Sequence, residues 1–214
     1  MFENRKDAGQ KLASALNQFK HKNPLILAIP RGGVEVAYHV ALALNAQLDI
    51  LIARKLPYPD NPEAGFGAIA EDGSTYINDF AARSLSPETI NKIKFDQTRE
   101  IKRRIETLRQ GHPLTPVNDR TVILIDDGIA MGSTIRSAIM LCRNHNAHRV
   151  IVAVPVTGPQ TARQIAQLVD QILILELPPF FQAVAQAYQH WYDVPDSEVI
   201  ELMTTWQEHL APSK

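Results

Sequence analysis

Residues 121–134 read Thr-Val-Ile-Leu-Ile-Asp-Asp-Gly-Ile-Ala-Met-Gly-Ser-Thr, and this stretch decides the fold. Its first five residues form a short apolar run that favours a buried strand. Asp126 and Asp127 follow at the carboxyl end of that strand, and small residues then lead into a helix that we predict to begin near Ser133. Open α/β sheets bind ligands outside the carboxyl ends of their strands. The stretch therefore predicts a ligand-binding turn between a core strand and a helix.

The turn combines two kinds of binding group. Adjacent carboxylates beside a hydrophobic strand are costly unless they are solvated or paired with a ligand, and here Asp126 and Asp127 can accept hydrogen bonds from hydroxyl groups. Backbone N–H groups at the start of a helix lack intrahelical acceptors and can hold an anion, helped by the helix dipole. Residues 131–134 would supply such a cradle. A sugar phosphate needs both kinds of group.

The rest of the chain alternates in the same way. Four more apolar runs of strand length are present, at Leu25–Ile29, Leu48–Ala53, Val150–Val154 and Ile172–Leu175. Helical spacing of apolar residues is found at 3–20, 34–44, 133–143 and 160–168. Strands that are buried on both faces show such continuous apolar runs. The alternation predicts a single α/β domain over residues 1–214, with a doubly wound, mainly parallel sheet flanked by helices.

Two segments depart from this alternation. We predict that residues 80–112 form a helical insertion. Residues 86–110 within it are rich in charged side chains, and Ser86 followed by Pro87 is a typical helix start, so we expect one long exposed helix or two in series there. Residues 177–214 are rich in aromatic side chains, and we expect them to form a hood over the site, with a helix that starts at Asp196. The aromatic side chains of the hood would pack on helices or stack on a planar base, and packing is the favoured interpretation.

Composition narrows the function classes. The chain has 214 residues and a net charge of −1, whereas a nucleic-acid-binding domain is expected to be clearly basic. The apolar runs are far shorter than the ~20 residues that cross a bilayer, and no signal peptide is recognisable at the N-terminus. The single cysteine, Cys142, excludes an internal disulfide and suits a reducing compartment. We expect a cytoplasmic protein that binds neither nucleic acid nor membrane.

The turn resembles a known motif. An apolar strand, two acidic residues and a small-residue turn ending in Gly-x-Thr are similar to the motif of type I phosphoribosyltransferases that binds 5-phosphoribosyl-1-pyrophosphate (PRPP). The resemblance implies that the 5′-phosphate of PRPP is bound by Ala130, Met131, Gly132, Ser133 and Thr134. Met131 is the one departure, because the family usually has a threonine whose hydroxyl helps to bind this phosphate. Met131 supplies only its backbone N–H.

A second loop fits the same family. Pro30-Arg31-Gly32-Gly33 follows the first core strand and precedes a helix. Glycines allow backbone N–H groups to approach a ligand closely, and Arg31 adds a fixed positive charge. In the family this loop binds pyrophosphate, often with a non-proline cis peptide, and the resemblance places that bond between Pro30 and Arg31. The similarity is strongest to an uncharacterised group of phosphoribosyltransferase-like proteins with this Pro-Arg-Gly-Gly loop and a helical insertion.

Two more features follow in chain order. Arg54 and Lys55 close the second predicted core strand, and at the same sheet edge they would offset the growing negative charge of a pyrophosphate leaving group. Residues 57–73 form a long loop-like segment rich in glycine and proline, which would be either a lid over the reacting centre or a surface loop without function.

The resemblance implies an enzyme that moves 5-phosphoribosyl from PRPP to a nitrogenous small molecule and releases pyrophosphate. The implied catalytic residues are Asp126, Asp127, Arg31 and Lys55. The acidic pair would anchor the ribose hydroxyls, and the cations would stabilise pyrophosphate together with Mg²⁺. Substrate oxygens and water would hold most of the Mg²⁺ coordination shell, so no dedicated protein ligands are predicted. Family members often form homodimers, and the sequence leaves this open.

Other interpretations fit the sequence less well. Family members that use 6-oxopurines carry an aspartate where this chain has Ala130, which argues against hypoxanthine or guanine as the acceptor. A PRPP- or nucleotide-sensing module with the same fold and no turnover stays the alternative. The string Gly65-Phe66-Gly67-Ala68-Ile69-Ala70 matches a dinucleotide fingerprint but does not lie between a strand and a helix. The spacing of Cys142, His145 and His148 does not fit a metal site on one helix face. No Gly-x-Ser-x-Gly elbow of an α/β hydrolase is present.

Overall fold

The computed structural model describes residues 1–210 and contains a parallel sheet of five strands in the order β2-β1-β6-β7-β8. These strands are β1 (Leu25–Ala28), β2 (Gln47–Ile50), β6 (Thr121–Ile125), β7 (Arg149–Val156) and β8 (Gln171–Glu176). Every neighbouring pair is parallel. Each of the five predicted apolar runs therefore supplies a strand of this sheet.

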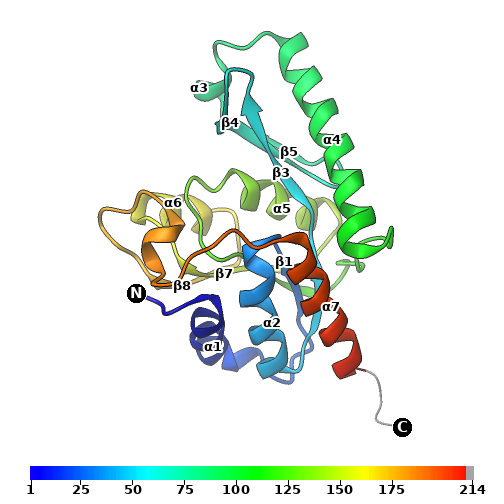
Figure 1. The fold of residues 1–214 in the computed structure, drawn as a ribbon, viewed down its shortest axis with the longest axis vertical. Helices are drawn as coiled ribbons and strands as arrows, with labels where there is room; N and C mark the ends of the chain where they lie inside the picture. Colours follow the sequence, from blue (N-terminus) through cyan, green and yellow to red (C-terminus); the bar gives the residue numbers. More distant parts are fainter. Residues whose placement is uncertain (211–214) are drawn as a thin grey trace.

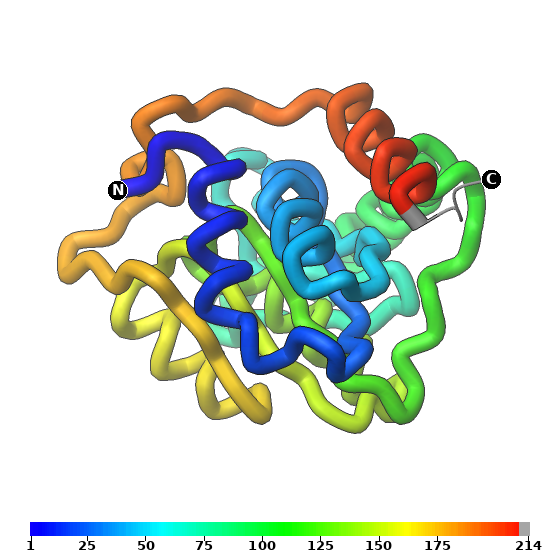
Figure 2. The backbone as a smooth tube through the Cα atoms, turned by 90° about the horizontal axis from the view of Figure 1, so that it is seen from below, coloured from blue at the N-terminus to red at the C-terminus, as the bar shows by residue number. Residues whose placement is uncertain are grey.

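Helices cover both faces of the parallel sheet. One face carries α1 (Arg5–Ala15) and α2 (Gly32–Leu44), with α7 (Asp196–Leu210) packed beside α2. Figure 2 shows these three helices gathered on one side of the molecule. The other face carries α5 (Ser133–Asn144) and α6 (Pro159–Ala166). Two short 3₁₀ helices, η1 (Asn17–Phe19) and η2 (Val184–Ala187), lie in connections. The arrangement confirms the predicted doubly wound fold.

The two helix layers produce two cores. Because successive side chains of a strand point to opposite faces, alternate residues serve alternate cores. Ile26, Ile123 and Ile151 belong to the core beneath α1 and α2, whereas Leu124 and Val152 belong to the core beneath α5. These side chains have no solvent-exposed surface. Burial on both faces explains why the strands appear as unbroken apolar runs in the sequence.

A second, antiparallel sheet rises from the parallel one and corrects two predictions. It consists of β3 (Ala53–Tyr58), β4 (Asn61–Ala70) and β5 (Thr75–Ile77), and Figure 1 shows it above the parallel sheet, next to α4. The prediction of one strand over Leu48–Ala53 was wrong, because β2 of the parallel sheet ends at Ile50 and β3 of the antiparallel sheet begins at Ala53. The segment 57–73 is also mostly strand instead of irregular loop.

The glycines of β4 explain the second error. Glycine usually weakens a strand unless another backbone or side chain approaches closely. A Cβ added at Gly67 would lie 2.2 Å from the carbonyl oxygen of Tyr76, and one added at Gly65 would lie 2.5 Å from Cγ of Lys55. Close strand packing requires glycine at both positions, whereas in the sequence the same glycines are typical of a loop.

The charged insertion forms α3 (Asp79–Ala82) and one long helix, α4 (Pro87–Arg109). The side chain of Ser86 accepts a hydrogen bond from the N–H of Thr89, and Pro87 occupies the first turn, as predicted. For residues 86–110 the structure therefore favours one long helix over two in series, and the short α3 precedes that range. In the C-terminal segment α7 begins at Asp196, and the last four residues of the predicted hood lie outside the described residues.

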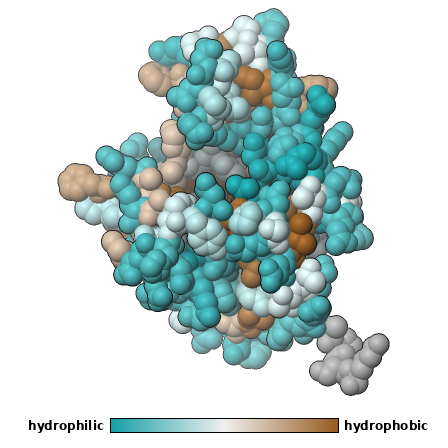
Figure 3. All heavy atoms as spheres, in the orientation of Figure 1, coloured by the Kyte–Doolittle hydropathy of each residue, from teal (hydrophilic) through white to brown (hydrophobic). Residues whose placement is uncertain are grey.

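The outer surface is mostly hydrophilic in the orientation of Figure 3, with small separate hydrophobic areas. It is hollowed between the part that contains the antiparallel sheet and the larger body that contains the parallel sheet. Within residues 1–210 no helix has the length and apolar character that a bilayer crossing requires.

Candidate active site

The turn after β6 is anchored firmly to its neighbours. The N–H of Ile129 donates to the carbonyl of Val156 at 2.9 Å, and the hydroxyl of Thr157 donates to the carbonyl of Ile129 at 2.7 Å. From α6, the hydroxyl of Thr161 donates to the carbonyl of Ala130 at 3.0 Å. Gly132 then adopts φ +79°, a left-handed conformation that favours glycine, immediately before α5 begins. The first N–H groups of α5 are therefore presented from a fixed turn.

A cavity of about 360 Å³ lies over this turn, and we name it the turn cavity. It is lined by residues from four parts of the chain, namely Lys55, Glu63, Ala64, Gly65, Asp126, Gly128, Ile129, Ala130, Met131, Gly132, Ser133, Thr134, Ile135 and Gln182. It brings together all five predicted phosphate-binding residues with Asp126 from the end of β6 and Lys55 from β3. An anion cradle, a carboxylate and an ammonium group thus face one space.

The acidic pair is held in an environment that disfavours charge. Asp126 accepts the N–H of Asp127 at 2.8 Å through its own side chain. Burial raises the pKa of Asp126 well above its usual range, and the neighbouring charge of Asp127 raises it further. Burial also raises the pKa of Asp127, although the positive charge of Arg5 opposes this shift. Asp126 lines the turn cavity, whereas Asp127 does not.

Arg5 is the partner of Asp127, and the sequence analysis missed it. Its Nε donates to Oδ2 of Asp127 at 2.9 Å, and the side chain is only 3% exposed. The guanidinium group lies 4.0 Å from the ring centroid of Trp191, and Nη1 donates to the carbonyl of Tyr192 at 3.0 Å. The hydroxyl of Tyr188 donates to the carbonyl of Asp127 at 2.6 Å. No local pattern marks Arg5, because a charged residue at the start of an amphipathic helix is ordinarily solvated.

These contacts give several hood aromatics a defined role. Tyr188, Trp191 and Tyr192 surround the guanidinium group of Arg5 and so pack beside the acidic pair. The favoured interpretation of packing is correct for Tyr188, which is buried, while Phe180 is 91% exposed. A cation held between aromatic faces and a carboxylate is strongly restrained.

The loop between β1 and α2 is pressed against the same acidic pair. The peptide bond between Pro30 and Arg31 is cis, as the resemblance implied. A Cβ at Gly32 would lie 1.8 Å from Oδ2 of Asp127, and a Cβ at Gly33 would lie 2.8 Å from Cα of Asp126. Glycine is needed at both positions because this loop touches the end of β6. Pro30, Arg31, Gly32 and Gly33 thus adjoin the site without lining the turn cavity.

Of the predicted cations, only Lys55 reaches the turn cavity. Arg54 and Lys55 lie in β3 of the antiparallel sheet, so the prediction that they close a strand of the parallel sheet was wrong. Neighbouring residues of a strand point to opposite faces. Lys55 donates to the carbonyl of Glu63 at 2.6 Å, whereas Nε of Arg54 donates to Gln97 of α4 at 3.2 Å. Burial lowers the pKa of Arg54, and Arg104 lowers it further.

Arg31 points to a different neighbour. Its Nη1 lies 3.6 Å from Oδ1 of Asp196 at the start of α7, and its side chain is 37% exposed. The structure therefore brings Arg31 to the rim between the β1–α2 loop and the hood, outside the turn cavity.

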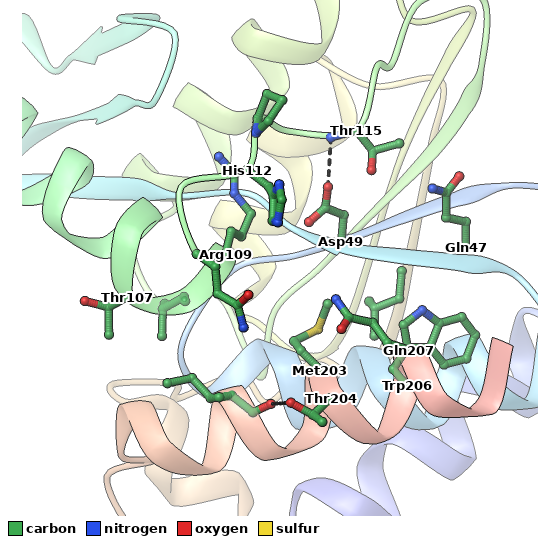
Figure 4. Close-up of a pocket in the computed structure, with 15 residues that line it drawn as sticks. Gln47, Asp49, Thr107, Arg109, His112, Thr115, Met203, Thr204, Trp206 and Gln207 are labelled. Carbon is green, nitrogen blue, oxygen red and sulfur yellow. Dashed lines mark hydrogen bonds between the residues drawn. The ribbon is translucent and has the colours of Figure 1, made fainter. Parts of the chain in front are cut away.

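Another cavity of about 350 Å³ lies away from the turn, between β2, the end of α4 and α7. Figure 4 shows Asp49, Arg109 and Met203 around it, with the side chain of Asp49 accepting the N–H of Thr115 at 2.8 Å. None of the predicted site residues lines it. Among residues 1–210 no group of three or more histidine, cysteine, aspartate or glutamate side chains is arranged to hold a metal ion.

Comparison with known proteins places the chain in a family. Residues 2–189 match the family described as phosphoribosyl transferase domain. The chain belongs to the phosphoribosyl transferase family, and its mainly parallel sheet flanked by helices is the type I fold that the sequence predicted.

Individual relatives agree with this assignment. Two proteins from two strains of Mycobacterium tuberculosis, provisionally named as phosphoribosyl transferases, are each 38% identical over 205 residues, which is 95% of this chain and 46% of the relative. The chain thus spans about half the length of these curated relatives. The crystal structure of the Thermus thermophilus protein TT1426 has a TM-score of 0.81 and 32% identity, covering 96% of this chain and 98% of that one. The Aquifex aeolicus protein AQ2163 shares the fold at a TM-score of 0.51 and 12% identity, over 81% of this chain and 74% of that one.

Proposed function

We propose that this chain transfers the 5-phosphoribosyl group from PRPP to a nitrogenous small molecule. The observation that carries the proposal is the convergence of Asp126, Lys55 and the start of α5 on one cavity. In the reaction the bond between C1′ and the pyrophosphate oxygen breaks, a bond forms between C1′ and the acceptor nitrogen, and the acceptor nitrogen loses a proton. Pyrophosphate leaves with the bonding electron pair.

Each group in the turn cavity has a role in this reaction. The N–H groups of residues 131–134 hold the 5′-phosphate, because the first N–H groups of a helix lack intrahelical acceptors and lie at the positive end of its dipole. Asp126 in its ionised form accepts a ribose hydroxyl and favours positive charge on the ring. Lys55 offsets the negative charge that grows on pyrophosphate. Arg5 keeps the Asp127 carboxylate in place beside Asp126 and is a positioning residue.

The β1–α2 loop completes the pyrophosphate side. Gly32 and Gly33 lie against the acidic pair, so their backbone is next to the ribose end of a bound PRPP. Arg31 belongs to the same loop and supplies a second positive charge at the rim of the site. Asp127 contributes through its contact with Gly32 and through its charge rather than as a lining group of the turn cavity.

Magnesium fits this donor chemistry as an ion that arrives with the substrate. Asp126 and Glu63 line the turn cavity and offer the carboxylate oxygens that Mg²⁺ prefers, and pyrophosphate supplies the others. When bound, Mg²⁺ would neutralise charge on the pyrophosphate. Ala130 offers no carboxylate near the acceptor, which supports an acceptor other than a 6-oxopurine.

The test is to incubate the protein with PRPP, Mg²⁺ and a panel of nitrogenous bases and to follow pyrophosphate release by mass spectrometry. We expect release with at least one base and loss of release in Asp126→Asn. The matched control is Asp119→Asn, which changes an exposed carboxylate before the start of β6 and leaves release unchanged. PRPP binding without pyrophosphate release across the panel would favour the sensing module instead. Such a module would explain why the exposed Met131 stands where the family usually has a threonine hydroxyl.

A further inference from the structure

A second polar cavity adjoins the phosphate cradle, and we name it the side cavity. Its volume is about 560 Å³, and it lies against α5, α6 and the antiparallel sheet. It is lined by Gly65, Tyr76, Asn78, Ala81, Ala130, Met131, Ser133, Arg136, Gln160, Thr161, Gln164, Gln167 and Leu168. Gly65, Ala130, Met131 and Ser133 also line the turn cavity. The two cavities therefore meet at the residues that would hold a 5′-phosphate.

Arg136 gives the side cavity its charge. It is the one charged residue among those that line this cavity within residues 1–210. Its guanidinium group lies 5.0 Å from the ring centroid of Tyr76, and Nη2 donates to Gln164 at 2.8 Å. Its Nε is buried and has no hydrogen-bond partner. A buried N–H group without an acceptor is costly, so an acceptor supplied by a ligand would be stabilising.

The place of Arg136 on its helix is also unfavourable in the absence of an anion. Arg136 is the fourth residue of α5, and the first turn of this helix contains no acidic residue. A positive side chain near the N-terminus of a helix opposes the helix dipole. A bound anion would offset both the dipole and the charge of the guanidinium group.

The remaining lining groups suit a polar ligand. Side-chain amides of Asn78, Gln160, Gln164 and Gln167 can donate hydrogen bonds, and no carboxylate lines the cavity within the described residues. Met131 lines both cavities and is 73% exposed. Its flexible thioether side chain can therefore change conformation beside a ligand that occupies both cavities.

We propose that the side cavity receives a second phosphate joined to the 5′-phosphate, so that the protein binds ribosyl compounds whose 5′-phosphate is extended as a diphosphate. The inference rests on the proposed function, since it takes the turn cavity as the site of the ribose 5-phosphate part. A 5′-phosphate site without an adjoining cavity would have no room for the second phosphate of such compounds. The extended part lies against Arg136 and the amides of α6.

Isothermal titration calorimetry tests this with three probes. Ribose 5-phosphate carries only the first phosphate, ADP-ribose carries the same group extended by a second phosphate and adenosine, and AMP represents the adenosine half alone. We expect ADP-ribose to bind at least about tenfold more tightly than either of the other probes, as for an added hydrogen bond between charged groups. Arg136→Gln is expected to remove that difference and to leave ribose 5-phosphate binding unchanged.

Arg143→Gln is the matched control, because Arg143 lies on the same helix but pairs with Asp170 at 2.9 Å. It should retain the preference for ADP-ribose. Equal affinities for ribose 5-phosphate and ADP-ribose in the unaltered protein would overturn the inference and leave the proposed function intact. A preference that survives Arg136→Gln would also overturn it. If none of the probes binds, both the inference and the proposed function fail.

Discussion

Asp126 links the chemistry of the site to pH. In the proposed site its carboxyl group accepts a ribose hydroxyl more strongly when it is ionised, but burial and the nearby Asp127 charge raise its pKa well above the usual range. We therefore expect the affinity for ribose 5-phosphate to rise as pH increases through this raised pKa, and then to level off. Calorimetric titrations between about pH 5 and pH 9 check this, and Asp126→Asn should leave only the dependence that comes from the phosphate group of the ligand, which ionises at about pH 6. A flat profile in the unaltered protein would contradict the role given to Asp126.

The same pKa shift predicts a cost in stability. In the native state Asp126 holds a proton over a pH range in which the unfolded chain has released it, because its folded pKa is the higher one. Stability therefore falls as pH rises from the ordinary aspartate pKa to the raised folded pKa. Asp126→Asn keeps an oxygen that can accept the N–H of Asp127 and removes the penalty.

Asp126→Asn should therefore raise the melting temperature at pH 8 by about 2–4 °C for each ~1 kcal/mol relieved, and change it little near pH 4. Thermal melts of both proteins at the two pH values measure this. An equal loss of melting temperature at both pH values would show that burial of the Asp126 carboxylate does not lower the stability of the protein.

Arg5 and Arg109 form a matched pair of buried arginines. Arg5 bonds to Asp127 at the site, whereas Arg109 bonds to Glu71 and to the carbonyl of Ile50 away from it. Arg5→Lys and Arg109→Lys should each lower the free energy of unfolding by about 1–3 kcal/mol, because hydrogen bonds to charged groups are lost. Only Arg5→Lys should also weaken ribose 5-phosphate binding. Urea denaturation and calorimetry separate the two effects, and equal binding losses would reduce Arg5 to a purely structural residue.

Among the connecting elements, the β1–α2 loop offers a sharp test of close packing. Gly32 has no room for a Cβ beside Asp127, whereas Gly73 in the β4–β5 turn has open space but adopts φ +91°. Gly73→Ala should cost about 1–2 kcal/mol from backbone strain and leave ligand binding unchanged. Gly32→Ala should cost about 1–3 kcal/mol from overpacking and also abolish binding, because Asp127 must move. If Gly32→Ala bound ribose 5-phosphate normally, this loop would not belong to the site.

At the level of elements, the sequence predicted what local pattern controls. The parallel strands were recognisable from their apolar runs, α5 from the glycine and small residues before Ser133, and α4 from Ser86 and Pro87. The antiparallel strand β4 was not, because its glycines are explained only by the strand that packs against them. In the site, Asp126, Lys55 and the turn were predicted, whereas Arg5 and Gln182 were not. Their contribution depends on distant segments that meet only in the folded chain.

Across the whole molecule, the turn cavity lies where the antiparallel sheet meets the parallel one. Lys55, Ala64 and Gly65 reach it from β3 and β4, and Asp126 reaches it from the end of β6. Bound PRPP would contact both parts, so the antiparallel sheet is in a position to act as a lid, which is one of the two interpretations of residues 57–73.

We expect PRPP with Mg²⁺ to slow amide hydrogen exchange in β4 by up to about tenfold at a concentration about ten times Kd. Residues 200–209 of α7, which neither line the turn cavity nor pair with Arg31, are the internal control. Mass spectrometry of proteolytic peptides resolves the two segments. Unchanged exchange in β4 at saturating PRPP would show that the antiparallel sheet takes no part in binding.

The central claim is that one turn binds a sugar phosphate by two different groups, and a crystal structure with ribose 5-phosphate tests it most directly. The account predicts phosphate oxygens within hydrogen-bond distance of the backbone N–H groups of residues 131–134 and a ribose hydroxyl donating to Asp126. A sugar phosphate bound elsewhere, or a turn cavity filled by the side chain of Met131, would contradict it.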